Sequence, residues 1–219
     1  PNEALLHNIS GVCYKATGQL EMAAQSFKRA VAIKSDFADA HYNLGLTLQE
    51  LNQLDDAVKC YEKALTIKPD YAEAFNNLGV TLKDLDQLDE AVKCYEKALI
   101  IKPDYPEAHN NLGNALKNLG RASKAAECFE RMLTIEPDYA EGHNNLGITL
   151  MILGQPNAAV KCYMKALSIE PEYAEAHNNL GITLDALGRI EDAEASYKKA
   201  LSIAPHYAEA HSNLGDLLK

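Results

Sequence analysis

The sequence lacks several features that would assign it to a particular class of protein. It contains no tryptophan, and no apolar run approaches the ~20 residues that cross a bilayer. Its 21 lysines and arginines are outnumbered by 31 acidic residues, and the formal charge of -10 works against binding to nucleic acid or to an anionic membrane. Neither an initiator methionine nor a targeting signal is seen at Pro1 to Ala4. We therefore expect a piece of a longer protein that binds neither nucleic acid nor membrane.

The sequence motifs of common enzymes are also missing. There is no glycine-rich phosphate loop, no HExxH and no GxSxG sequence. We therefore expect this part of the protein to have no catalytic residue, no metal ligand and no cofactor.

What the sequence does contain is an internal repeat of 34 residues. Its clearest sign is a series of glycines at this spacing: Gly11, Gly45, Gly79, Gly113, Gly147, Gly181 and Gly215. A period of this length is typical of a repeat array. We expect residues 1–219 to form a single array with full repeats at residues 4–37, 38–71, 72–105, 106–139, 140–173 and 174–207. Residues 1–3 would end a preceding repeat, and residues 208–219 would form the first helix of a truncated last repeat.

Each repeat has the pattern of two antiparallel helices. In residues 72–105, apolar residues recur at helical spacing on both sides of a polar break at Asp86. Glycine supplies the turn between the helices in most repeats, and Asn52 and Asp86 take its place in two of them. These glycines are Gly18, Gly120, Gly154 and Gly188. Asp70 and Asp138 each precede an acidic residue by three positions, which predicts a helix N-cap with a capping-box partner.

The repeats resemble the tetratricopeptide repeat (TPR). In residues 38–71 the resemblance rests on His41, Leu44, Gly45, Ala57, Tyr61, Ala64 and Pro69. It implies an all-α fold, a right-handed superhelical solenoid of antiparallel helix pairs, in which the first helices line a concave groove. The chain departs from the family pattern where histidine or Phe75 replaces the commoner aromatic residue, and where leucine follows the glycine, as at Leu48. Both changes keep a bulky packing group.

Several other residue types recur in register with the repeat. Cys60, Cys94, Cys128 and Cys162 share one column, and six of the seven histidines share another. Equivalent positions of stacked helix pairs lie at least ~8–10 Å apart, which is too far for a disulfide or a zinc site. We expect reduced, half-buried thiols, a cytoplasmic location, and histidine rings that pack between helices with one nitrogen hydrogen-bonded. We also expect core tyrosines, as at Tyr61, and glycines that let helices approach, as at Gly79 against Ala91.

The candidate binding residues are asparagines of the first helices. They are Asn43, Asn77, Asn111, Asn145, Asn179 and Asn213, with a second asparagine directly before four of them at Asn76, Asn110, Asn144 and Asn178. Asparagine is a poor residue for the middle of a helix, and a row of amides can bind the peptide groups of an extended chain. On this interpretation, replacing Asn111, Asn145 and Asn179 with alanine weakens binding and leaves stability nearly unchanged. The alternative is that these amides are exposed and satisfied by water or by each other.

Charged residues beside the asparagines indicate the chemistry of the partner. Glu107, Glu141 and Glu175 begin first helices, and Lys83 and Lys117 balance them only in part. We therefore expect a protein or peptide partner that is polar or basic. TPR proteins that bind carboxylate tails have Lys or Arg two positions into a first helix and again four later. Glu175 and Asn179 hold those positions here, so a free C-terminal carboxylate is a disfavoured ligand.

The leading hypothesis is a non-catalytic interaction scaffold that binds an extended peptide or partner protein in its groove. The sequence His-Asn-Asn-Leu-Gly at residues 177–181 is also similar to the asparagine-lined TPR arm of O-linked N-acetylglucosamine transferases and bacterial TPR-transferase proteins. This second resemblance implies the alternative of a substrate-recruiting arm of a larger glycosyltransferase or sulfotransferase. A metal or redox protein is a third alternative. Lastly, Leu214, Leu217 and Leu218 predict an exposed apolar face and weak self-association through the last helix.

Overall fold

The structure is a computed structural model and describes residues 2–219. Those residues contain thirteen helices and no strand, so the expected all-α fold is confirmed. The chain divides into two compact units, unit 1 at Pro1–Asn111 and unit 2 at Leu112–Lys219. Of the residues expected to end a preceding repeat, Pro1 lies outside the described residues, whereas Asn2 and Glu3 belong to the first helix.

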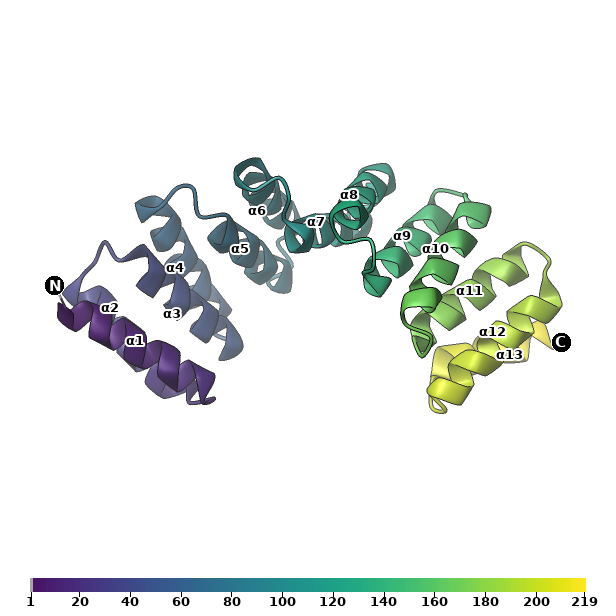
Figure 1. Cartoon of the computed structure of the whole chain (residues 1–219), viewed down its shortest axis with the longest axis horizontal. Coiled ribbons are helices and arrows are strands. Elements are labelled where there is room, and N and C mark those ends of the chain that lie inside the picture. The colour runs from purple at the N-terminus through teal and green to yellow at the C-terminus, as the bar shows by residue number, and fades with distance from the viewer. Residues whose placement is uncertain (1) are drawn as a thin grey trace. The chain divides into compact units, whose positions relative to one another are not determined.

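The helices of unit 1 pair in the order of the sequence (Figure 1). The pairs are α1 (Asn2–Ala16) with α2 (Leu20–Ile33), α3 (Ala38–Glu50) with α4 (Leu54–Ile67), and α5 (Ala72–Asp84) with α6 (Leu88–Ile101). The second helix of a pair also packs on the first helix of the next, as α2 does on α3 and α4 on α5. Helix α7 (Pro106–Asn118) contains the division between the units.

Unit 2 continues the same arrangement. It contains α8 (Ala122–Ile135), the pair α9 (Ala140–Ile152) and α10 (Pro156–Ile169), the pair α11 (Ala174–Ala186) and α12 (Ile190–Ile203), and a last helix α13 (Ala208–Leu217). Across residues 2–219, no helix combines the length and the apolar character that crossing a membrane requires.

The turns within the helix pairs adopt the left-handed conformation that the sequence predicts. The four turn glycines have φ between 70° and 75°. Asn52 and Asp86, which stand in the same place, have φ of 57° and 60°. Asparagine and aspartate tolerate this conformation better than other residues with a Cβ, which explains why they can replace glycine here.

The predicted N-caps are wrong. Helix α5 begins at Ala72 with Tyr71 as its N-cap, helix α9 begins at Ala140 with Tyr139 in that place, and no side chain caps either helix. Asp70 and Asp138 lie one residue earlier, in the turn. Each helix thus begins one residue later than predicted, and the tyrosine at this junction takes a different role described below.

An aromatic residue of each second helix fills the space inside its helix pair. Phe27, Tyr61, Tyr95, Phe129, Tyr163 and Tyr197 are all at most 1% exposed, which confirms the expected core role of these four tyrosines and adds two phenylalanines to it. The repeat glycine lies directly against this ring, because a Cβ added at Gly79 would come within 2.6 Å of the Tyr95 ring. The glycine therefore makes room for the aromatic ring, whereas the sequence analysis assigned that close approach to Ala91.

In most repeats, the histidine of the histidine column is hydrogen-bonded to the loop that precedes the first helix. In five repeats the histidine Nε2 lies 2.8–3.0 Å from the backbone carbonyl oxygen six residues earlier. These histidines are His41, His109, His143, His177 and His211. A carbonyl only accepts, so Nε2 carries the hydrogen and donates it. The predicted hydrogen bond is thus present, and the rings are half-buried in four of these repeats and exposed at His211.

The cysteine column and the last helix complete the packing. Cys60 and Cys94 are half-buried free thiols, and burial raises the pKa of each to about 11, so both stay protonated. In α13, Leu214 and Leu217 are half-buried against a cluster that includes Leu184 and Tyr197. Only Leu218, at 64% exposed, fits the expected apolar face, because α13 packs its other leucines on the preceding helices.

Candidate functional site

The asparagines form a ladder of hydrogen bonds between neighbouring repeats, here named the amide ladder. The second asparagine of one repeat donates an Nδ2 hydrogen to the side-chain oxygen of the first asparagine one repeat earlier. The bonds from Asn111 to Asn76, from Asn179 to Asn144 and from Asn213 to Asn178 are 3.0 Å long, and that from Asn43 to Asn8 is 3.1 Å. The partners are 35 residues apart in every case, so each bond joins two different columns of the repeat.

The ladder explains why asparagine occurs in the middle of these helices. Asn76, Asn144 and Asn178 are only 4%, 1% and 0% exposed, and a buried amide needs hydrogen-bond partners. Asn145 is buried as well, and Asn110 is half-buried. The alternative given above, that the amides hydrogen-bond to each other, thus accounts for one donor and one acceptor in each bond of the ladder. Replacing ladder asparagines with alanine is therefore expected to lower stability, contrary to our sequence-based expectation.

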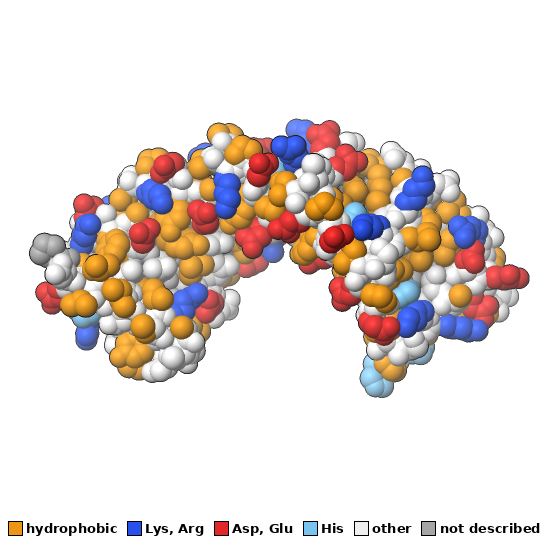
Figure 2. All heavy atoms as spheres, in the orientation of Figure 1, with side chains coloured by type: hydrophobic (Ala, Val, Ile, Leu, Met, Phe, Trp, Pro, Cys, Tyr) orange, Lys and Arg blue, Asp and Glu red, His pale blue; other side chains and the backbone are white. Residues whose placement is uncertain are grey.

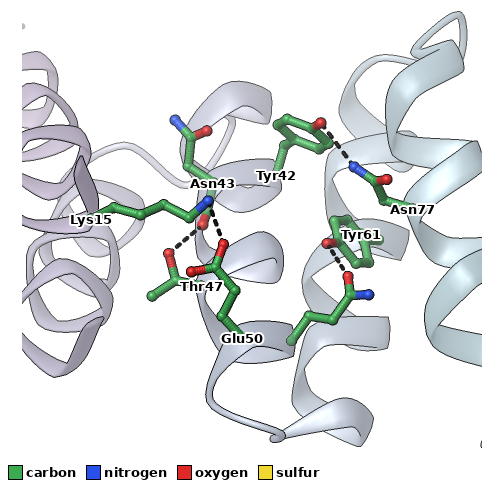
Figure 3. Close-up of polar contacts among 8 residues, drawn as sticks. Lys15, Tyr42, Asn43, Thr47, Glu50, Tyr61 and Asn77 are labelled. Carbon is green, nitrogen blue, oxygen red and sulfur yellow. Dashed lines mark hydrogen bonds and ion pairs between the residues drawn. The ribbon is translucent and has the colours of Figure 1, made fainter. Parts of the chain in front are cut away.

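One rung in unit 1 uses a tyrosine in place of the first asparagine. Asn77 donates its Nδ2 hydrogen to the hydroxyl oxygen of Tyr42 at 2.9 Å, as Figure 3 shows. The Tyr42 ring lies 4.8 Å from the ring of Tyr71, centroid to centroid, and burial raises the pKa of the Tyr42 hydroxyl. Figure 3 also shows Lys15 of α1 paired with Glu50 of α3 at 2.7 Å. Sequence analysis missed Tyr42, although its position matches that of Asn76 in the next repeat.

In unit 2, one of the predicted glutamates is bonded to this ladder and the other to a neighbouring tyrosine. Asn144 donates an Nδ2 hydrogen to Glu175 Oε1 at 3.1 Å. The hydroxyl of Tyr139, the junction residue before α9, donates to Glu141 Oε2 at 2.7 Å. Burial lowers the pKa of Lys117, and the charges of Glu175 and Glu141 oppose that shift. The three predicted charged residues of unit 2 thus interact electrostatically.

The remaining predicted residues lie in unit 1 and are less closely connected. Lys83 is exposed and pairs with Asp84 at 3.5 Å. Glu107 is also exposed, and after burial its charge contributes most to raising the pKa of Tyr105. The tyrosine and glutamate at the start of a first helix thus interact in both units, a pairing that sequence analysis did not anticipate.

The chemistry of this surface is that of hydrogen bonding and negative charge. Asn111 and Asn179 each use one amide hydrogen in the ladder, and their second hydrogen and their oxygen have no partner within residues 2–219. Among the same residues, no group of three or more His, Cys, Asp or Glu side chains is arranged to hold a metal ion. We call the ladder asparagines and their neighbouring glutamates the polar face of each unit.

Sequence profiles of the tetratricopeptide repeat match most of the chain. A profile described as "TPR repeat" matches residues 11–52 and 81–120, and profiles described as "Tetratricopeptide repeat" match residues 38–71, 60–93, 106–139 and 138–206. Together these matches run without a gap from residue 11 to residue 206. A search of curated proteins found no match, so the resemblance to transferase arms stays a prediction.

Several solved structures are similar over most of the chain. PilF of Pseudomonas aeruginosa has a TM-score of 0.83 and 19% identity over 98% of both chains. PilW, described as a widely conserved type IV pilus biogenesis factor, has a TM-score of 0.81 and 24% identity over 99% of this chain and 98% of its own. YrrB, described as a TPR protein with an unusual peptide-binding site, has a TM-score of 0.75 and 24% identity over 86% of this chain and 97% of its own. The fold and the profile matches agree, and the chain belongs to the tetratricopeptide repeat family.

Proposed function

We propose that this chain is a non-catalytic scaffold that binds an extended segment of a partner protein on its polar face. The observation that carries the proposal is the amide ladder in unit 2, with Glu175 bonded to Asn144 of the ladder and Glu141 bonded to Tyr139. Donor and acceptor groups recur there from one helix pair to the next. The part of a protein partner that recurs in the same way is its backbone, with one donor and one acceptor in each residue.

The spacing of the ladder suits an extended peptide. Neighbouring helices lie ~8–10 Å apart, and an extended strand rises ~3.3 Å per residue, so about three residues of a bound peptide span one repeat. Because Asn179 is held by its bond to Asn144, its remaining hydrogen and its oxygen have a fixed direction before a partner arrives. Such preorganised amides bind peptide groups with little dependence on the sequence of the partner.

The charge of the polar face favours lysine or arginine in the partner. Glu141 and Glu175 are exposed, and Lys117 is the basic residue that competes for them. The similarity to YrrB, whose description names a peptide-binding site, supports a peptide as the ligand. A cytoplasmic location is part of the proposal, supported by free thiols at all five cysteines. Weak self-association through α13 was a separate expectation, and it rests on Leu218 alone.

The proposal is tested with a random library of dodecapeptides displayed on phage and selected on the purified 219-residue chain. We expect the selected peptides to be rich in lysine, arginine and polar residues. The best peptide is then synthesised, and its affinity is measured by fluorescence anisotropy at low and moderate salt. For the double variant Glu141→Gln/Glu175→Gln we expect about fivefold weaker binding, equivalent to about 1 kcal/mol, and a smaller salt dependence.

The substitutions are chosen to separate binding from folding. A glutamine oxygen still accepts the hydrogen bonds from Asn144 and Tyr139, so only the charge is removed. The matched control is Glu127→Gln/Glu130→Gln, which removes the same charge from exposed positions of α8, a second helix of the same unit. Equal affinity of the peptide for the parent chain and the Glu141→Gln/Glu175→Gln variant contradicts the proposed surface. Failure to select any peptide contradicts peptide binding itself.

A further inference from the structure

In unit 1, a lysine side chain covers the aromatic residue at the junction before a first helix. Lys68 Nζ lies 4.0 Å from the centre of the Tyr71 ring, before α5, and Lys102 Nζ lies 4.4 Å from that of the Tyr105 ring, before α7. A cation within ~6 Å of the centre of an aromatic ring is attracted to the negative face of that ring. These two junctions are therefore occupied by a cation of the chain itself.

The junctions of unit 2 have a glutamate where this lysine would be. Glu136 holds the place of Lys102 before α9, and Glu170 holds it before α11. Both glutamates are exposed, and the tyrosines that follow them, Tyr139 and Tyr173, are half-buried. Within residues 2–219, no lysine or arginine lies over the ring of either tyrosine. The ring position that holds a cation in unit 1 is thus without one in unit 2.

The first of these junctions contains a pocket on the surface of unit 2. The pocket has a volume of about 310 Å³, and its lining residues are Glu136, Pro137, Asp138 and Tyr139. Asp138 is paired with Lys165 at 3.0 Å, whereas the carboxylate of Glu136 has no hydrogen-bond or ion-pair partner in the described part of the chain. The pocket thus offers a cation an aromatic ring and a carboxylate that is not already paired.

We propose that this pocket binds a lysine or arginine side chain of the partner protein, with the cation over the Tyr139 ring and beside Glu136. The proposal rests on the function proposed above for the existence of a basic partner, and it names the place where one basic residue is bound. Lys102 shows that the equivalent ring of unit 1 is accessible to a cation. The exchange of this lysine for glutamate removes the cation of the chain and supplies the opposite charge, so a cation of another molecule can take its place.

The second junction has the same residues and can bind a second basic side chain. Asn144 Nδ2 donates to the hydroxyl oxygen of Tyr173 at 3.4 Å, and the hydroxyl of Tyr139 donates to Glu141 at 2.7 Å. The polar end of each tyrosine is therefore bonded within unit 2, and the ring face and the preceding glutamate remain for a ligand. A partner with two basic residues can contact both junctions.

The overall negative charge would also attract a basic peptide, so the test has to separate the two effects. The chain has a formal charge of -10, and acidic side chains are spread over the visible surface of unit 2 (Figure 2). At physiological salt this attraction is screened within ~8 Å, and it changes to a similar extent when any exposed acidic residue of the unit is replaced. Binding in the pocket depends on particular residues.

The first test returns the lysine of unit 1 to the junctions of unit 2. The probe is a fluorescein-labelled dodecapeptide of alternating lysine and serine, and fluorescence anisotropy measures its affinity for the purified 219-residue chain. In Glu136→Lys/Glu170→Lys, the new lysines should cover the two tyrosine rings and weaken binding about tenfold. The matched control Glu127→Lys/Glu130→Lys makes the same change of charge at exposed positions of α8 and should weaken binding about threefold at most. Equal weakening by both variants, or a parent that does not bind the peptide, overturns the proposal.

A second pair of variants tests the role of the rings. Tyr139→Leu/Tyr173→Leu keeps every charge and removes both rings, and should weaken binding of the same peptide about fivefold. Tyr139→Phe/Tyr173→Phe keeps the rings and removes only the hydroxyls, and should bind like the parent. Thermal unfolding followed by circular dichroism shows whether each variant is folded. Equal losses of affinity in the leucine and phenylalanine variants would assign the effect to the hydroxyls and overturn the proposal.

Failure of this pocket can be distinguished from failure of the polar face. The same peptide is measured with Glu136→Lys/Glu170→Lys and with Glu141→Gln/Glu175→Gln. Weaker binding only in the first variant supports the pocket and contradicts the polar face, whereas weaker binding only in the second overturns the pocket and supports the polar face. Weaker binding in both supports both surfaces, and unchanged binding in both overturns both.

Discussion

The same repeat is built with different residues in the two units, and the differences show what the fold requires. The turn inside a helix pair has positive φ at Asn52 and Asp86 in unit 1 and at Gly154 and Gly188 in unit 2. One ladder bond of unit 1 has the hydroxyl of Tyr42 as its acceptor, whereas the other ladder bonds of unit 1 and those of unit 2 have an asparagine oxygen, as at Asn76 and Asn144. The fold therefore requires a backbone conformation and an acceptor atom at these positions, and more than one residue type supplies each.

The substitutions are less equivalent on the surface than in the packing. Asn144 also donates to Glu175, whereas Tyr42 stacks on Tyr71. Phe75 replaces the histidine that bonds a loop carbonyl elsewhere, and Lys97 Nζ lies 5.4 Å from the centre of its ring. Unit 1 thus adds aromatic side chains to the amides of its polar face, whereas in unit 2 a ladder amide is bonded to a carboxylate. We therefore expect the same kinds of packing to stabilise both units, and we expect the two units to prefer different ligands.

Alkaline pH should produce the largest effect, and should act on both units alike. Burial raises the pKa of Tyr61, Tyr95 and Tyr163 above the usual range of tyrosine, and raises that of Tyr197 to about 12. The folded chain keeps these phenols protonated while the unfolded chain ionises them near pH 10. The free energy of unfolding therefore falls as pH rises above about 10, by about 1.4 kcal/mol per pH unit for each tyrosine.

Urea unfolding at a series of pH values from 8 to 11 measures this loss. Tyr163→Phe/Tyr197→Phe is the comparison variant, because phenylalanine already occupies the same column at Phe129 in unit 2. Its stability should depend less on pH than that of the parent. A free energy of unfolding that is constant up to pH 11 would contradict the burial of these hydroxyls, and a loss confined to one unit would break the equivalence of the two.

Substitution of the repeat glycine should give the next largest effect, again equally in both units. A Cβ at Gly79 or Gly147 would come within 2.6 Å of the ring of Tyr95 or Tyr163, respectively. We expect Gly79→Ala and Gly147→Ala each to lower the free energy of unfolding by about 1–3 kcal/mol through overpacking. Gly215→Ala is the control, because nothing lies within 4 Å of a Cβ at that position. It should be neutral or slightly stabilising, because alanine is the better helix former, and a comparable loss there would show that contact with the aromatic ring does not decide the outcome.

Removal of a ladder donor should give the smallest effect and should differ between the units. Asn179→Ala leaves the oxygen of Asn144, a residue only 1% exposed, without its donor, and should cost about 1 kcal/mol. Asn77→Ala leaves the hydroxyl of the half-buried Tyr42, which water can reach, and should cost about half as much. Thermal and urea unfolding measure both. Equal losses of stability in the two variants would show that the exposure of the acceptor does not determine how much a ladder bond contributes.

Features that repeat in the sequence were predicted more successfully than contacts between repeats. The helix pairs, the positive φ at Asn52 and the hydrogen-bonded histidines follow from local patterns, because each involves residues close in sequence. Bonding between the amides was expected only as an alternative. Its pairing was not predicted, because the partners are 35 residues apart and therefore lie in two different columns of the 34-residue repeat. The N-caps failed for a different reason: the helix begins directly after Tyr139, and the Glu141 carboxylate, the expected capping-box partner, accepts a hydrogen bond from the Tyr139 hydroxyl. The binding role of the site residues stays a prediction.

The bonds of the ladder join only neighbouring repeats, and this affects how the chain folds. Its side-chain bonds join residues 35 positions apart, and contacts between helices are confined to nearby helices in the sequence. No long loop has to close before native contacts begin to form, so the entropic barrier to folding is low for a chain of this length. Folding can start at any helix pair and spread to its neighbours. By the same logic, duplication or loss of a whole repeat in the gene changes the length of the array without requiring the rest of the protein to be redesigned.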